Sequence, residues 1–404
     1  MPSSEQTAVR TKDAVVVLID AFRDDSHEKK VNLCPGMYCD DNARTWVLPA
    51  VKKARELLLA DPNFNHDVLP QQGYPAFVSA ARQIAFGDTL NTRIITSIQT
   101  IGGTGANQFI ARFMSDNHRP STVWLSDPSW ENHTQIWTYV NPEIEQCYYP
   151  YYDYKTSTLD IEGMTSTLHD RANSGDVLVL QTCGHNPTGL DLSREQWSRI
   201  AEICEDKKLF PVFDSAYQGI ATGDTDEDAW AIRHFATRSY GMEFAVAQSF
   251  SKNFGLYGER VGALHIVTND RDVAASVQDK LKKIARAEFT SAPCFGAKII
   301  ATVFETPALR EQWQCDLKTI SSRLRRMRRR LYDALVKRGT PGNWGHMLTD
   351  LGFFSMTGFS PEQVAVLRDS FHIYLLPTGR LAFTGLTEAA VEYVADSIHQ
   401  VIVS

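Results

Sequence analysis

The chain has 404 residues, 43% of them hydrophobic and 22% charged, which is ordinary for a globular protein and leaves room for a large domain and a smaller one. The formal net charge of −7 gives no electrostatic reason to expect nucleic acid or an anionic membrane surface as a partner. No apolar run approaches the ~20 residues that span a bilayer, no targeting pattern opens the chain, and seven cysteines without a CxxC pair predict reduced thiols in the cytoplasm and no metal site.

The first part of the chain predicts an arm followed by short separate elements. Residues 1–12 are polar and predict an extended N-terminal arm. An apolar segment at 14–22 and an irregular strand or loop at 31–38 follow. Apolar residues then recur at helical spacing over 48–59 and 74–86, and each of these segments predicts a helix.

From residue 94 the chain alternates between strands and helices. Six short runs are apolar and rich in β-branched residues, and each predicts a strand: 94–100, 122–126, 177–183, 209–213, 244–247 and 261–267. Helix-like stretches such as 193–204 lie between several of them. The alternation predicts an α/β fold with a doubly wound, mostly parallel central sheet flanked by helices. Since such sheets bind ligands at the carboxyl ends of their strands, the residues that follow each strand are the candidates for function.

Beyond residue 300 the pattern becomes helical again. Apolar residues at 320, 324, 327, 331 and 335 predict one long amphipathic helix. Six arginines between residues 323 and 330 allow either a nucleic-acid-binding face or a solvated helix face, and the acidic total charge favours the solvated face. We expect residues 45–310 to form the large domain, and residues 13–44 with 311–404 to form a smaller α+β domain.

One lysine stands where a buried strand should end. Lys252 follows the apolar run 244–247 and is flanked by Ser249 and Ser251, with Arg260 eight residues further on. Removal from water lowers the pKa of a lysine toward the neutral amine that attacks carbonyls, and two hydroxyls with an arginine can hold a phosphate. The pattern suggests a carbonyl-reactive lysine beside a phosphate anchor, which pyridoxal phosphate requires. For a lysine considered alone, an ordinary surface lysine is the better interpretation, so the residues at the other strand ends have to decide between the two.

A glycine-rich turn follows the strand predicted at 94–100. Gly103 and Thr104 precede a helical run, so backbone N–H groups and the helix dipole favour a phosphate there. A dinucleotide-binding turn, and with it a nicotinamide-dependent dehydrogenase, is the distant alternative, because Gln108 stands where the third small residue of that turn belongs.

Four further side chains follow strands of the predicted sheet. Trp130 offers a flat face to a planar ring, although tryptophan more often fills a core. Asn186 lies in an Asn-Pro-Thr-Gly sequence that is either a simple turn or the site of a donor to a phenolate oxygen. Asp214 ends an apolar run and predicts a buried carboxylate that needs a cation such as a pyridinium nitrogen, and Tyr217 stands within reach of the same ring.

Together these residues resemble the class I, fold type I pyridoxal-phosphate-dependent aminotransferases, in particular the aspartate aminotransferase group. The resemblance extends from about residue 14 to the C-terminus. Asn-Pro-Thr-Gly at 186–189, Asp-Ser-Ala-Tyr-Gln-Gly at 214–219 and Ser-Phe-Ser-Lys-Asn-Phe-Gly-Leu-Tyr at 249–257 carry it. It implies a homodimer with shared active sites and pyridoxal 5′-phosphate bound in the domain of residues 45–310.

The resemblance also implies a role for each candidate. Lys252 matches the lysine that binds the cofactor covalently and then transfers a proton as general base and acid. The other matches are the phosphate ligands Gly103, Thr104, Ser249, Ser251 and Arg260, the stacking ring Trp130, the phenolate partners Asn186 and Tyr217, and the pyridinium partner Asp214 with its supporting His133.

Substrate binding is implied for five positions. Arg380 matches the ligand of the substrate α-carboxylate, and Arg286 matches the ligand of the distal carboxylate that reaches over from the partner subunit. Gly36 matches the loop that closes over the substrate, and Trp130 and Asn186 border it. The implied reaction transfers the amino group between aspartate/oxaloacetate and glutamate/2-oxoglutarate. A broad-specificity or aromatic aminotransferase of the same family is the alternative.

Two cofactor-site positions depart from the family pattern. Val68 replaces a tyrosine that reaches the neighbouring subunit's phosphate, and Gln181 replaces a histidine near the pyridinium partner. The loss of a hydrogen bond to phosphate predicts weaker cofactor binding. The resemblance also implies cis peptide bonds before Pro128 and Pro187.

The substrate loop and the distal arginine have unusual neighbours too. Pro35 lies in the closing loop, and Phe289 and Ser291 replace a tyrosine and an asparagine beside the distal arginine. These changes predict a stiffer loop and some breadth toward aromatic or other amino acids.

Overall fold

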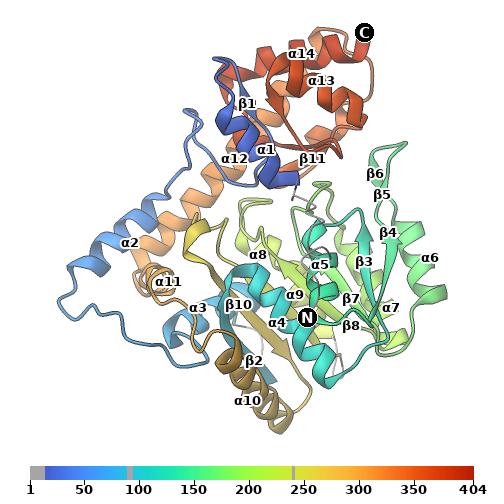
Figure 1. Cartoon of the computed structure of the whole chain (residues 1–404). Coiled ribbons are helices and arrows are strands. Elements are labelled where there is room, and N and C mark those ends of the chain that lie inside the picture. The colour runs from blue at the N-terminus through green and yellow to red at the C-terminus, as the bar shows by residue number, and fades with distance from the viewer. Residues whose placement is uncertain (1–13, 89–93, 239–241) are drawn as a thin grey trace, which may run out of the picture. The chain divides into compact units, whose positions relative to one another are not determined.

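The computed structural model describes residues 14–88, 94–238 and 242–404 (Figure 1). The chain divides into two compact units. The larger is Trp46–Arg323 with Asp350–Gly352, and the smaller is Met1–Thr45, Leu324–Thr349 and Phe353–Ser404. The predicted arm at residues 1–12 lies outside the described residues. The first boundary between the units lies between residues 45 and 46, and the sequence predicted it between 44 and 45. The second lies between residues 323 and 324, inside a helix, and the sequence predicted it between 310 and 311. The domain assignment itself stays a prediction.

Within the described ranges, a seven-stranded sheet forms the centre of the larger unit. Its order is β2-β10-β9-β8-β7-β3-β4, and β10 runs antiparallel to its neighbours while the other pairs are parallel. The bounds are β2 Ile95–Ile101, β3 Thr122–Asp127, β4 Glu145–Pro150, β7 Val177–Gln181, β8 Phe210–Ser215, β9 Phe244–Ser249 and β10 Val261–Val267. A separate antiparallel pair consists of β5 Tyr152–Asp153 and β6 Thr158–Leu159. The predicted α/β fold with a mostly parallel sheet is confirmed.

Helices cover both faces of this sheet (Figure 1). Alternate residues of β7 supply the two cores, because successive side chains of a strand point to opposite faces. Val177 and Val179 pack with α4, α5 and α10, whereas Leu178 and Leu180 pack with α3, α6, α7 and α9. The bounds are α2 Pro49–Ala60, α3 Pro75–Phe86, α4 Gly102–Asn117, α5 Glu131–Val140, α6 Ile161–Arg171, α7 Arg194–Lys207, α8 Thr225–Asp228, α9 Trp230–Arg238, α10 Arg271–Glu288 and α11 Phe295–Glu305.

All six predicted strands are present, and the helix predicted at 193–204 is α7. Its start has a chemical cause: Ser193 Oγ accepts a hydrogen bond from the backbone N of Gln196, and Gln196 Oε1 accepts one from the backbone N of Ser193. The strand β4 was not predicted. It lies at the sheet edge beside β3, and Tyr149 is its buried residue, so its sequence shows no apolar run.

The smaller unit combines short elements from both ends of the chain. β1 Val31–Asn32 pairs in parallel with β12 Ile373–Tyr374, and β11 Phe354–Met356 pairs antiparallel with β13 Arg380–Ala382. The apolar segment at 14–22 is helical. The helices are α1 Ala14–Asp24, α13 Pro361–Phe371 and α14 Val391–Val403, and α12 Pro307–Lys337 contains the division at 323/324. Short 3-10 turns are η2 Tyr257–Glu259, η3 Gly345–Leu348, η4 Phe383–Gly385 and η5 Glu388–Ala390.

The arginine-rich stretch of α12 is not a uniformly solvated face. Arg323 and Arg328 are 5% and 2% exposed, and Arg328 Nη2 donates to a backbone carbonyl of β11 at 2.8 Å. Arg326 and Arg330 form ion pairs with Glu388 at 2.9 and 2.8 Å. The expectation of a solvated face is therefore wrong for two of the six arginines, because Arg323 and Arg328 are both buried and Arg328 contacts β11 inside the smaller unit.

Two features of the described ranges concern membranes and metal ions. None of their helices is both long and apolar enough to cross a membrane. Their His, Cys, Asp and Glu side chains form no group of three or more suited to a metal ion.

Candidate active site

Lys252 lies in the turn after β9, at the carboxyl end of the parallel strands. Its Nζ is 5.3 Å from the centroid of the Tyr217 ring, which comes from the turn after β8. Burial lowers the pKa of the Lys252 ammonium, the Asp214 carboxylate opposes this shift, and the charge of Arg260 adds to it. The neutral amine is therefore more favoured for Lys252 in this turn than for an exposed lysine.

The predicted phosphate ligands converge where α4 begins. A Cβ on Gly103 would lie 2.7 Å from the Cβ of Ser249, and a Cβ on the glycine before it would lie 2.5 Å from Arg260 Nη2. Arg260 Nη1 donates to Ser251 Oγ at 3.3 Å, and the backbone N of Ser251 donates to Ser249 Oγ at 3.2 Å. Thr104 lies partly exposed in the same first turn of α4. A helix N-terminus, hydroxyls and a guanidinium therefore share one small cradle.

Asp214, near the end of β8, forms a buried pair with His133 of α5. Asp214 Oδ2 lies 2.8 Å from His133 Nε2, and both side chains are less than a tenth exposed. Because a carboxylate only accepts hydrogen bonds, Nε2 carries the proton of this contact. His133 Nδ1 lies 3.0 Å from Ser129 Oγ, and the Trp130 ring stands edge-on to the imidazole at 5.1 Å. This arrangement fixes the direction of the carboxylate.

Asn186 follows β7 and is 8% exposed. The peptide bonds Asp127–Pro128 and Asn186–Pro187 are both cis, as predicted. Asn186 follows β7, Asp214 lies near the end of β8, and Lys252 follows β9. Because these parallel strands are neighbours in the sheet, the three residues lie at the same edge of it.

Arg380 and Gly36 belong together in the smaller unit. Arg380 is 7% exposed, and its Nη2 donates to the backbone O of Cys34 at 2.7 Å. Its Cζ lies 4.2 Å from the centroid of the Phe354 ring. A Cβ on Gly36 would lie 2.9 Å from Cζ of the same ring, so the glycine permits the loop to pack there. The backbone of Pro35 is fixed as well, because its carbonyl oxygen accepts a hydrogen bond from Thr384 Oγ1 at 2.9 Å.

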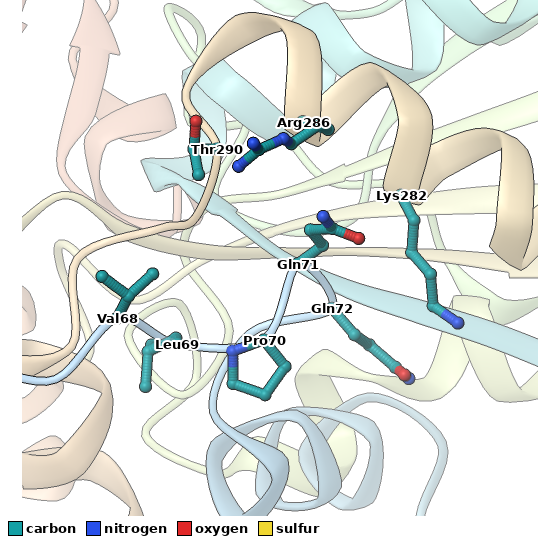
Figure 2. Close-up of a pocket in the computed structure, with 8 residues that line it drawn as sticks. All are labelled: Val68, Leu69, Pro70, Gln71, Gln72, Lys282, Arg286 and Thr290. Carbon is teal, nitrogen blue, oxygen red and sulfur yellow. The ribbon is translucent and has the colours of Figure 1, made fainter.

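Arg286 lies near the end of α10 and is exposed. It lines an open pocket of about 440 Å³ whose other residues are Val68, Leu69, Pro70, Gln71, Gln72, Lys282 and Thr290. Figure 2 shows the side chains of Lys282 and Arg286 extending from α10 over the segment at 68–72. Val68 is 78% exposed, unusually high for an apolar residue.

The model of the family described as aminotransferase class I and II matches residues 28–398. The chain belongs to this family. It is 44% identical over 400 residues to the L-tyrosine:2-oxoglutarate aminotransferase of Aspergillus ustus, covering 96% of this chain and 76% of that protein. The structure of aspartate aminotransferase from Saccharomyces cerevisiae cytoplasm is similar with a TM-score of 0.95 at 39% identity, covering 98% of this chain and 97% of that one. The aromatic-amino-acid aminotransferase from Burkholderia pseudomallei, covalently bound to pyridoxal phosphate, is similar with a TM-score of 0.94 at 33% identity over all of both chains.

Membership confirms the family resemblance and the fold type I architecture. The protein is a transaminase, and the alternative of a nicotinamide-dependent dehydrogenase is set aside. Enzymes of this family depend on pyridoxal phosphate and act on amino acids and 2-oxo acids.

Sequence reasoning missed several residues that organise the site of this aminotransferase. Asp191 accepts hydrogen bonds from the backbone N of Gly184 and of His185, at 2.7 and 3.1 Å. Asn253 Nδ2 donates to the backbone O of Gln218 at 3.1 Å and so holds the lysine turn. Asn253 is adjacent in sequence to a recognised site residue, which was an available signal, whereas the role of Asp191 depends on loop folding.

Proposed function

We propose that this aminotransferase uses pyridoxal 5′-phosphate to transfer the amino group between L-aspartate/oxaloacetate and L-glutamate/2-oxoglutarate in the cytoplasm. The observation that carries the proposal is the convergence at one sheet edge of Lys252, the Asp214–His133 pair and the cradle around Gly103. The yeast cytoplasmic aspartate aminotransferase, with its TM-score of 0.95, supports the substrate and the location.

The residues of the cradle fit the phosphate of that cofactor. Glycine is required where Ser249 and Arg260 approach α4, because a Cβ would fill the space. The guanidinium, two serine hydroxyls and the N-terminus of α4 supply a positive charge and hydrogen-bond donors for a dianion. Asp214 would meet the ring nitrogen, and Asn186 with Tyr217 would meet the ring oxygen.

The chain supplies acid–base chemistry around that ring. When bound, the cofactor supplies a ring that accepts electron density from the substrate carbon. Lys252, whose pKa is lowered by burial, provides a neutral amine that attacks a carbonyl and that can accept and return a proton. Asp214, oriented by His133, sets a negative charge where a protonated ring nitrogen requires one.

Two arginines would select dicarboxylic substrates. Arg380 suits the α-carboxylate, since its planar fork forms bidentate pairs and its ring contact with Phe354 restrains it. Arg286 suits the distal carboxylate of a site in a partner subunit. Its exposure beside Val68, itself largely exposed, supports a homodimer in which this face of α10 meets the partner.

A broad-specificity or aromatic aminotransferase is the second candidate. The relative at 44% identity is named for tyrosine, and this observation favours the alternative. Phe289, beside the end of α10, stacks on Phe109 with ring centroids 5.2 Å apart. Apolar character near Arg286 would suit an uncharged substrate side chain.

A substrate panel with the purified protein tests the proposal. We expect the absorbance of the bound cofactor and a kcat/KM for aspartate at least about tenfold above those for tyrosine and phenylalanine, with 2-oxoglutarate as acceptor. The reverse order would favour the second candidate. A protein that carries no cofactor after incubation with pyridoxal phosphate and shows no amino transfer would refute both.

A further inference from the structure

Gln181, the last residue of β7, forms a closed ring with the backbone of one site residue. Its Oε1 accepts from the backbone N of Asn186 at 2.8 Å, and its Nε2 donates to the backbone O of Asn186 at 2.9 Å. Both ends of one side-chain amide are thus used on the two backbone groups of a single residue. Two contacts on opposite sides of a residue fix its rotation as well as its position.

Further contacts hold the residues on either side of Asn186. Asp191 accepts from the two preceding backbone N–H groups, and the His185 ring lies 3.1 Å from Ser126 Oγ and 2.9 Å from Thr188 Oγ1. The residue after Asn186 is a proline, which has no N–H to donate. Gln181 is the side chain that contacts both the backbone N–H and the backbone carbonyl of Asn186.

The same strand end also holds Asp214. Gln181 and Asp214 are register partners in the β7–β8 pair. The next residue, Thr182, donates its backbone N–H to the backbone O of Asp214 at 3.1 Å. The end of β7 thus contacts one residue through a side chain and the other through the backbone, so it sets the distance between them.

We propose that Gln181 is a positioning residue that orients Asn186 relative to Asp214, so that the Asn186 amide meets the ring hydroxyl of the cofactor while Asp214 meets the ring nitrogen. This inference rests on the proposed function, in which Asn186 contacts that hydroxyl. In this role Gln181 would act through the Asn186 backbone and not by contact with the cofactor or the substrate. Gln181 should therefore strengthen cofactor binding only when the cofactor ring carries the hydroxyl.

Equilibrium binding to the cofactor-free protein separates this role from a general structural one. The probes are pyridoxal phosphate and 3-deoxypyridoxal phosphate, which lacks the ring hydroxyl. Gln181→Met should bind pyridoxal phosphate about tenfold more weakly than the wild type, the equivalent of one ordinary hydrogen bond. Its affinity for the deoxy probe should stay within about twofold of the wild-type value, since the contact that it disorders is absent there.

Gln146→Met is the matched control. Gln146 is also a partly buried glutamine on a parallel strand of this sheet, with Nε2 donating to Thr134 O at 3.2 Å and to Thr138 Oγ1 at 2.9 Å. Its replacement should leave both affinities unchanged. Equal weakening of both probes by Gln181→Met, or no weakening of either, would overturn the inference. A wild-type protein that binds neither probe would instead overturn the proposed function, and the inference with it.

Gln181→Glu provides an independent test if the methionine variant does not fold. A protonated carboxyl has one donor and one acceptor, as the amide has, but an ionised carboxylate only accepts and would face the Asn186 carbonyl oxygen. The affinity of Gln181→Glu for pyridoxal phosphate, relative to the wild type, should be lowest near about pH 8 and should recover as the pH falls and the carboxyl is protonated. Partial burial, the facing Asn186 carbonyl oxygen and the neighbouring Asp214 charge raise the pKa of this carboxyl above its ordinary value of about 4.3. A pH-independent ratio would contradict the proposed role.

Discussion

At the scale of single residues, the environment of Lys252 explains why a lysine is suited to this turn. Desolvation penalises the charged ammonium, and Asp214 offsets part of that penalty. The resulting pKa is lower than that of an exposed lysine, so a larger fraction of the amine is neutral at physiological pH. The neutral amine is the form that attacks a carbonyl and accepts a proton.

Replacement of Lys252 by alanine should abolish covalent attachment of the cofactor and lower turnover by about 10⁴-fold, the upper range for a positioned general base. Absorbance of the purified protein and steady-state kinetics measure the two effects. Lys30→Ala is the control, because Lys30 is also partly buried but donates to the backbone O of Phe22 and of Asp25 in the smaller unit. A Lys252→Ala variant with wild-type turnover would rule out the proposed mechanism.

Asp214→Asn preserves the size of the side chain but removes its charge. We expect kcat to fall by about 10²- to 10³-fold, because a neutral amide stabilises a protonated ring nitrogen less, and we expect the cofactor to remain bound but more weakly. Asp176→Asn controls for loss of a buried carboxylate, since Asp176 accepts from Ser121 Oγ and Trp124 Nε1 at the opposite end of the parallel strands. That control should lower stability and leave kcat near the wild-type value. An unchanged kcat in Asp214→Asn would remove Asp214 from its assigned role.

At the scale of elements, the cradle depends on how closely α4 approaches the end of β9. The sequence places glycines in the first turn of α4, and the structure shows what they permit. Gly103 lies against Ser249, whereas a Cβ on Gly105 would lie 3.4 Å from Ile101 Cβ, close to ordinary van der Waals contact. Two glycines of one helical turn therefore have different tolerances for a side chain.

This difference gives a matched pair of variants. Gly103→Ala should weaken binding of pyridoxal phosphate by about tenfold or more, because overpacking against Ser249 costs about 1–3 kcal/mol. Gly105→Ala should leave the affinity within about twofold and stabilise α4 by about 0.5–1 kcal/mol, since alanine favours the helix over glycine. Calorimetric binding to the cofactor-free variants and urea unfolding measure the two effects. Equal affinities for the two variants would show that the contact of α4 with β9 does not shape the phosphate site.

At the scale of the whole molecule, the proposed function requires a residue that serves a neighbouring subunit. Arg286 is exposed and shares a pocket with Val68 and Lys282, as Figure 2 shows. The segment at 68–72 and the end of α10 thus form one face of a single chain. A dimer would place this face against the site of the partner.

Arg286→Ala should lower kcat/KM for aspartate and glutamate by about two to four orders of magnitude, because loss of one partner of a desolvated ion pair costs about 3–5 kcal/mol. Substrates with uncharged side chains should keep their kcat/KM or gain, since they never form that pair. Arg271→Ala, at the exposed start of the same helix, is the control and should change neither value.

Mixed dimers test whether Arg286 acts across the interface. A heterodimer of Lys252→Ala and Arg286→Ala subunits would place both lesions in one site and leave the other intact, so about half of the wild-type dicarboxylate activity should return in each heterodimer. If heterodimers form and no activity returns, Arg286 does not act in the site of the partner.

The sequence by itself determined the features that depend on neighbouring residues or on side-chain chemistry. Runs of β-branched residues predicted six strands of the central sheet, because a strand that is covered on both faces needs continuous apolar side chains. The edge strand β4 was missed for the same reason, since Tyr149 is its one buried residue and the others are exposed or only partly buried. Asp214 was recognisable because it comes directly after an apolar run, and Lys252 and Asn186 because each lies in the short polar turn that follows such a run.

The tertiary structure alone decided the contacts that join distant parts of the chain. The pair of Asp214 with His133 spans 81 residues, and the contact of Arg380 with the Cys34 carbonyl spans 346. The burial of Arg328 and the use of both ends of the Gln181 amide on Asn186 depend on how helices and loops pack. Hydrophobic periodicity can be read from consecutive residues of the sequence. The direction of a hydrogen bond depends on the path of the backbone, which the whole fold determines.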